Sequence, residues 1–407
     1  MKKIFSIIFK LYLIIILFLY TYSPEVNLGP PYARHAIVML YIGISIYLFY
    51  SIFIKKNKLI KINTIFDWFM LLFIYYILFE SIMYPKSFLT SINISIMIIL
   101  VFLLIKIFQY NLLVYGREKI ENIFEFLFST FLIFILLSTI VAFLDLLNVF
   151  TLFKIPDISQ YKRVQSWFSN STIYGVNIAI SIMFSYYFYF RYASKKFLII
   201  IFWLLYWMLM TGGRTALIIT VIGILINFIF RYKIQKLITY FIVLITVIFF
   251  NFSNLSRSFL MIRRLMNGGF GKRGLKAIEV FNIWLEQNFI NKIFGSGIDN
   301  LLDVHSFSAH SGFLRLWFDF GLLFVLIYCF FIFFVIKKYI DIIKITDNND
   351  KNLMITGFAV TLMYFFAESM IIITISSIYD FCLLLIIAGL PFIYRRPFKK
   401  IKIIRKR

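Results

Sequence analysis

The chain has 407 residues, of which 62% are hydrophobic and 21% aromatic, and its mean hydropathy is +0.91. A soluble domain contains about 45–50% apolar residues, so this composition excludes a soluble globular protein and indicates an integral membrane protein. The formal net charge of +24 does not indicate a nucleic-acid partner, because the lysines and arginines form short clusters between apolar runs and share no soluble face.

The first 23 residues combine a basic start with a long apolar run. This run exceeds the about 7–15 residues of a signal-peptide core, and no small-residue cleavage site follows it. We therefore expect a first membrane span that is retained. The two cysteines, Cys329 and Cys382, lie inside apolar runs and predict neither a disulfide framework nor a metal site.

A transmembrane helix needs about 20 mostly apolar residues. This length predicts an all-α, polytopic protein with about twelve transmembrane helices in a single membrane domain over residues 1–407. An abrupt turn is expected between the seventh and eighth spans. The predicted spans are 4–21, 36–54, 64–83, 92–108, 123–147, 173–190, 197–211, 215–230, 237–252, 312–336, 353–372 and 378–394.

The positions of the cations predict the orientation. If both termini are cytoplasmic, every inner segment carries at least two lysines or arginines and most of the 42 lie inside, as short cytoplasmic loops require. The remaining cations gather mainly in the loop after the fifth span, which contains Arg163, and in a large outer loop over residues 253–311. The positive-inside rule disfavours lysine and arginine on the outer side of the membrane. Their presence there predicts an anionic ligand on that side.

The large outer loop is expected to be helical. Residues 255–266 have the apolar spacing of an amphipathic helix at the membrane interface, and its arginines include Arg264, a candidate for substrate contact. Contact with lipid phosphate is an equal alternative for Arg257 and Arg263. After a glycine-rich break, a second helix is expected to end at Gly295. Arg273 lies between glycines that allow a large head group to approach, and is a further candidate for a ligand contact.

Two further motifs contain ionisable residues at predicted outer boundaries. TGGRTAL, residues 211–217, predicts a sharp turn that holds Arg214; snorkelling to lipid phosphate is the alternative. AHSGFLRLWFDFG, residues 309–321, contains His310 and Arg315 at the start of a span. A neutral imidazole suits a general base, whereas a hydrogen-bonded structural histidine is the alternative. Arg315 is expected either to bind substrate or only to pack.

No carboxylate pair has the spacing of a metal site, and no Walker motif, GxSxG elbow or nucleotide-binding glycine loop occurs. We therefore expect neither a metal nor a cofactor. A reaction in this chain must use a substrate that is already activated.

Four features, in order, resemble the O-antigen polymerase and ligase superfamily of bacterial envelope glycosyltransferases. They are the Arg163 loop with SNSTIYG, the TGGRTAL turn, the long outer loop that ends in FGSGIDN, and AHSGFLRLWFDFG. The similarity extends over roughly residues 160–330, and Ser311 stands where the family often has Asn.

The resemblance implies a metal-independent polymerase that joins undecaprenyl-diphosphate-linked oligosaccharide units on the periplasmic face of the inner membrane. It implies that Arg214 and Arg163 hold the diphosphate with help from Arg273, and that His310 acts as general base. Its implied partners are the lipid-linked oligosaccharide, the bilayer and a chain-length regulator protein. A ligase that transfers finished polymer to lipid A core is the nearest alternative, and a non-catalytic flippase for the same lipid-linked sugar is an alternative from another class.

Overall fold

A computed structural model describes most of the chain, and every regular element that it contains is a helix. The described residues are 2–21, 33–54, 64–85, 88–147, 166, 168, 171–211, 213–231, 271–297, 312–346, 348–370 and 378–394.

The helices follow the apolar segments of the sequence. Among the described residues, six helices are long and apolar enough to cross a membrane, and four more apolar helices are shorter. The number of about twelve spans stays a prediction, and the segment 237–252 lies outside the described residues. The predicted turn between 197–211 and 215–230 is confirmed, because α7 ends at Met210 and α8 begins at Arg214.

The chain divides into two compact units. Unit 1 comprises residues 1–40 and 124–269, and unit 2 comprises residues 41–123 and 270–407. The prediction of one membrane domain over residues 1–407 concerns how these units sit together and stays a prediction.

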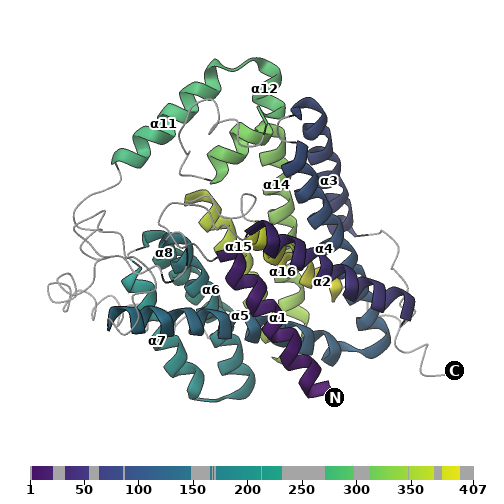
Figure 1. The fold of residues 1–407 in the computed structure, drawn as a ribbon, viewed down its shortest axis with the longest axis vertical. Coiled ribbons are helices and arrows are strands. Elements are labelled where there is room, and N and C mark those ends of the chain that lie inside the picture. Colours follow the sequence, from purple (N-terminus) through teal and green to yellow (C-terminus); the bar gives the residue numbers. More distant parts are fainter. Residues whose placement is uncertain are drawn as a thin grey trace. The chain divides into compact units, whose positions relative to one another are not determined.

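In unit 1, α6 packs against both α7 and α8 (Figure 1). The helices that lie wholly in unit 1 are α1 (Lys2–Thr21), α6 (Ser171–Tyr192), α7 (Lys196–Met210) and α8 (Arg214–Arg231), and most of α5 (Arg117–Leu146) also belongs to it. Phe128 and Phe184 stack with ring centroids 4.2 Å apart, so α5 and α6 share an aromatic core.

In unit 2, α14 packs against α3, α15 and α16, and α4 packs against α3 and α16. Figure 1 shows α11 and α12 at one end of this group, beside the start of α14. The helices of unit 2 are α3 (Ile65–Met83), α4 (Phe88–Tyr115), α11 (Gly271–Glu286), α12 (Phe289–Phe294), α14 (Gly312–Ile345), α15 (Asn348–Met370) and α16 (Ile378–Ile393), with the end of α2 (Ala33–Phe49) and the π-helical turn η1 (Tyr50–Ile54).

The last helix of unit 2 contains a proline, Pro391. Proline has no amide hydrogen, so the carbonyl of Ile387, four residues earlier, cannot accept its usual helical bond. The Tyr339 hydroxyl of α14 donates to that carbonyl at 2.5 Å. A hydrogen bond between helices thus replaces the missing one within α16, as the membrane interior requires.

The helical prediction for the large loop is confirmed in part. A helix covers most of the second predicted segment, and the chain leaves the helical conformation at Gly295, as expected. It breaks once, at Gln287 and Asn288, where the Asn288 side chain accepts from the Asn291 amide at 2.7 Å and begins α12. The predicted interfacial helix 255–266 lies outside the described residues.

Candidate functional site

The TGGRTAL turn of unit 1 is closed by the Thr211 hydroxyl. This hydroxyl donates to the Met208 carbonyl at 2.7 Å and accepts from the Gly213 amide at 3.3 Å. It therefore satisfies one group from the end of α7 and one just before the start of α8. Arg214 follows at once as the first residue of α8.

The start of α6 packs directly against this turn. A Cβ atom added to Gly175 would lie 2.8 Å from the Thr211 hydroxyl oxygen and 2.9 Å from the Ala216 methyl group. Only glycine permits so close an approach. SNSTIYG and TGGRTAL, which are separate in the sequence, thus form one small-residue contact, defined here as Gly175 against Thr211 and Ala216.

The segment before α6 is anchored to α5. The Ser166 hydroxyl donates to the Ser138 carbonyl at 2.9 Å, and the Phe168 ring stacks on Tyr174 with centroids 4.8 Å apart. Both Ser166 and Phe168 are buried. Arg163, three residues before Ser166, lies outside the described residues.

The other two motifs meet in unit 2. Gly321 has φ 81 and ψ 172, which breaks α14 after its first nine residues. The break leaves carbonyls of the preceding turn without helical partners, and they accept instead from the FGSG segment: Ser296 N donates to Phe318 O at 3.0 Å and Gly297 N to Asp319 O at 3.1 Å. We call this pairing of 295–297 with 318–321 the glycine lock.

The glycine lock leaves no room for side chains at its centre. A Cβ atom on Gly295 would lie 2.1 Å from the Asp319 carbonyl oxygen, and one on Gly321 would lie 2.2 Å from the Ile293 carbonyl oxygen. Both glycines have positive φ, a conformation that L side chains rarely adopt. FGSG and FDFG are therefore two halves of one structural element.

Two tyrosines of the α3 region hold the lock from outside. The Tyr76 hydroxyl donates to the Phe320 carbonyl at 2.6 Å, and the Tyr84 hydroxyl donates to the Gly295 carbonyl at 2.5 Å. Tyr84 follows the last residue of α3, and burial followed by the nearby Glu80 carboxylate raises the pKa of its phenol above the ordinary value. The hydroxyl therefore remains a donor at neutral pH.

Arg315 is held by an acidic partner on its own helix. Its Nε atom lies 3.1 Å from the Asp319 Oδ2 atom, an i,i+4 ion pair whose carboxylate is buried. Behind this pair α11 packs on α14, with Val280 against Phe318 and the Trp284 and Trp317 rings 4.7 Å apart. Of the two expectations for Arg315, substrate contact or packing, the ion pair favours a positioning role.

Three of the six predicted site residues lie in described helices. Arg214 is the first residue of α8, Arg273 the third of α11 and Arg315 the fourth of α14. His310, Arg163 and Arg264 lie outside the described residues, although His310 precedes the first residue of α14 by only two positions. Arg214 belongs to unit 1, whereas Arg273 and Arg315 belong to unit 2.

These three arginines share an unusual position. Each lies in the first turn of a helix whose first turn contains no acidic residue. The helix dipole places partial positive charge there and disfavours cations. The backbone amides at the start of a helix attract anions, so α8 and α11 begin with a place that suits a phosphate group beside an arginine in the sequence.

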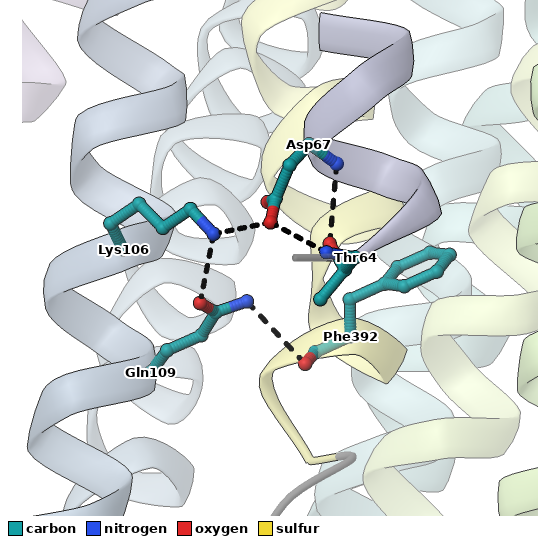
Figure 2. A network of polar contacts seen from close by, with 5 residues as sticks. All are labelled: Thr64, Asp67, Lys106, Gln109 and Phe392. Atoms are coloured by element: carbon teal, nitrogen blue, oxygen red, sulfur yellow. Dashed lines mark hydrogen bonds and ion pairs between the residues drawn. The ribbon is translucent and has the colours of Figure 1, made fainter. Parts of the chain in front are cut away.

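One buried ionic network lies within unit 2, and its lysine, Lys106, falls inside the predicted span 92–108. Lys106 Nζ lies 2.5 Å from Asp67 Oδ2, with side chains only 2% and 0% exposed. Asp67 also forms a capping box with Thr64 at the start of α3. Gln109 links Lys106 to the Phe392 carbonyl of α16, as Figure 2 shows.

This network joins three helices and pairs a buried lysine with a buried carboxylate, so we interpret it as a structural clamp between α3, α4 and α16. A Thr-x-x-Asp capping signal was present at residues 64–67, but it does not indicate a partner 39 residues later in the chain. Within the described ranges, no group of three or more His, Cys, Asp or Glu side chains is arranged to hold a metal ion.

No protein-family model matches this sequence, and no curated protein matches it either.

Proposed function

We propose that this chain is a membrane glycosyltransferase that polymerises oligosaccharide units carried on undecaprenyl diphosphate. One observation carries the proposal: the four motifs of the resemblance form two compact contacts, SNSTIYG with TGGRTAL and FGSG with FDFG. The first contact lies at the start of α8, which begins with Arg214, and the second holds the segment of α14 that contains Arg315. Motifs that are separate in the sequence but pack against each other in this way are expected to contribute to one functional site.

The proposed topology has about twelve spans in the bacterial inner membrane, with both termini cytoplasmic and residues 253–311 in the periplasm. Its support is the positive-inside pattern of the loops and the six long apolar helices. In this arrangement Arg163, Arg214, Arg273 and His310 share the periplasmic side.

In the proposed reaction, His310 removes the proton from an acceptor sugar hydroxyl, and the hydroxyl oxygen attacks the anomeric carbon of the donor. A new glycosidic C–O bond forms as the C–O bond to the diphosphate breaks. The electron pair of the broken bond leaves with undecaprenyl diphosphate. Arg214 and Arg163, assisted by Arg273, stabilise the charge that develops on this leaving group, a task that suits the bidentate guanidinium.

The test compares Arg214→Lys and His310→Ala with Lys196→Ala, which removes a cation from the first residue of the neighbouring helix α7. Loss of one group that stabilises transition-state charge typically costs about 100- to 1000-fold in rate. We therefore expect Arg214→Lys and His310→Ala to insert normally and yield single repeats, while Lys196→Ala yields long polymer. The readout is the length of lipid-linked chains in a deletion strain that expresses each variant.

The same strain distinguishes the alternatives. Loss of a ligase leaves long lipid-linked polymer but none on lipid A core, and loss of a flippase leaves the repeat unit on the cytoplasmic face. Long polymer from Arg214→Lys or His310→Ala would remove that residue from the mechanism.

A further inference from the structure

A cavity of about 430 Å³ with both polar and apolar lining lies within unit 2, where η1, the end of α4 and the start of α5 meet. Ligand sites typically measure about 300–1,000 Å³, so this cavity is large enough to hold a small polar group. It is lined by none of the residues assigned to the glycosyltransferase.

The floor of the cavity is uncharged. Ser51 and Asn111 are buried, and the Tyr47 hydroxyl forms hydrogen bonds with the side chains of both. Ser51 lies in the π-helical turn Tyr50–Ile54, and π turns occur frequently at functional sites. The floor thus presents hydroxyl and amide oxygens that can accept hydrogen bonds.

The rim is charged with both signs. Glu118 and Lys119 are adjacent, exposed residues in the first turn of α5, and both line the cavity. A ligand with a single charge would be attracted by one of them and repelled by the other. A ligand that carries a phosphate and an ammonium group can pair with both.

Apolar groups line the same cavity. Tyr115, at the end of α4, is 54% exposed, and Ile123 of α5 is partly buried. A cavity that combines charged, hydroxyl and apolar lining groups at the end of long apolar helices matches the division of a phospholipid into head group and acyl chains.

We propose that this cavity binds the head group of a zwitterionic phospholipid with a primary ammonium group, of the phosphatidylethanolamine type. Lys119 pairs with the phosphate. Glu118 and the floor oxygens accept hydrogen bonds from the ammonium group, and the acyl chains lie along Tyr115 and Ile123. This site is separate from the proposed glycosyl transfer and does not depend on it.

The experiment measures lipid retention by native mass spectrometry and the thermal midpoint of the purified full-length chain in detergent. Phosphatidylethanolamine, phosphatidylglycerol, phosphatidylcholine and soluble glycerophosphoethanolamine are added separately. A ligand that binds only the folded state raises the midpoint. We expect phosphatidylethanolamine to give the largest shift, because the glycerol head group lacks an ammonium and the choline head group lacks N–H donors.

Variants of the rim test the assignment of charges. Removal of one charged hydrogen-bonding partner is expected to weaken binding roughly tenfold or more. Glu118→Gln should abolish the preference for phosphatidylethanolamine over phosphatidylglycerol, and Lys119→Gln should weaken both lipids. The controls are Lys344→Gln and Glu286→Gln, which alter exposed residues away from the cavity and should bind as the wild type does.

Equal retention of all three lipids by the wild type, or unchanged preference in Glu118→Gln and Lys119→Gln, would overturn the proposal. A midpoint shift from glycerophosphoethanolamine as large as that from the intact lipid would overturn the role of the acyl chains. Because lipid retention requires no polymerase activity, a failure here leaves the proposed function untouched.

Discussion

The two units fix their motif pairs in different ways. In unit 1, α6 approaches the TGGRTAL turn through small side chains, and one threonine hydroxyl closes the turn. In unit 2, the backbones of FGSG and FDFG form hydrogen bonds directly with each other. The hydroxyls of Tyr76 and Tyr84 donate further hydrogen bonds to backbone carbonyls of this pairing. Arg214 therefore begins a helix at a turn held by side-chain contacts, whereas Arg315 lies on a helix segment fixed by the backbone of another segment.

This difference indicates separate roles for the two arginines. Arg315 is paired with Asp319 within its own helix, so it contributes to the shape of the segment that follows His310. Arg214 begins a helix at a turn whose closing groups are already satisfied by Thr211. We therefore expect unit 2 to depend more on rigid geometry and unit 1 to depend more on the identity of its arginine.

The largest expected effect comes from Gly321→Ala. The new methyl group would lie 2.2 Å from the Ile293 carbonyl oxygen and 2.4 Å from the Gly295 amide nitrogen, at a positive φ. We expect failure to fold or a loss above about 4 kcal/mol. The control is Gly116→Ala, which has φ +80 but nothing within 4 Å and should lose only about 1–3 kcal/mol. Thermal unfolding in detergent measures both, and equal losses would contradict the glycine lock.

The next effect compares the buried ion pair of unit 2 with a more exposed one in unit 1. Lys106→Met leaves a buried carboxylate without its cation and should cost about 3–5 kcal/mol. Adding Asp67→Asn, which keeps a capping oxygen for α3, should recover most of that loss. Arg191→Met breaks the Glu125–Arg191 pair, whose side chains are 16% and 21% exposed, and should cost less, about 1–3 kcal/mol, because Tyr187 and Tyr192 still donate to the Glu125 carboxylate. Similar losses from both single variants would remove the contrast between the units.

A smaller effect is expected at the small-residue contact of unit 1. Gly175→Ala introduces a methyl group against Thr211 and Ala216, and such overpacking typically costs about 1–3 kcal/mol. The double variant Gly175→Ala with Ala216→Gly should recover part of the loss, because it removes the contact with Ala216 but not the one with the Thr211 hydroxyl. The measurement is the midpoint of thermal unfolding of each variant. A double variant with the same midpoint as the single variant would contradict direct packing of α6 on the turn.

The smallest effect concerns pH. Because the folded-state pKa of Tyr84 is raised, its contribution to stability is complete below pH about 10 and is lost as pH rises through the folded-state value. Tyr84→Phe should therefore reduce the alkaline fall in stability of unit 2. The Thr211 hydroxyl in unit 1 does not titrate in this range. Thermal midpoints between pH 8 and pH 11 (roughly the range around the ordinary tyrosine pKa) test this, and superimposable profiles for variant and wild type would count against the assignment.

Much of the fold was predictable from local properties. Apolar length located the helices, and the glycine pair in TGGRTAL located the turn before Arg214. The break at Gly321 was not predicted, because the residues on both sides are apolar and read as one span over 312–336. A positive φ at this glycine depends on Ile293 and Gly295, which lie elsewhere in the sequence.

The candidate site was predictable in part for a similar reason. Arg214, Arg273 and Arg315 stood out because cations are rare beside apolar helices, and each lies in the first turn of one. The ion pair of Arg315 follows i,i+4 spacing and could have been read from the sequence. The partner of Lys106 could not, because no periodicity connects residues 67 and 106.

The proline in α16 has a consequence for biogenesis. α16 follows α14 in the sequence, so Tyr339 is translated before the carbonyl that it binds. Until the two helices meet, the Ile387 carbonyl has no amide partner in its own helix. The unmet hydrogen bond favours docking of α16 onto α14, and a chain truncated before residue 387 would leave Tyr339 without its acceptor.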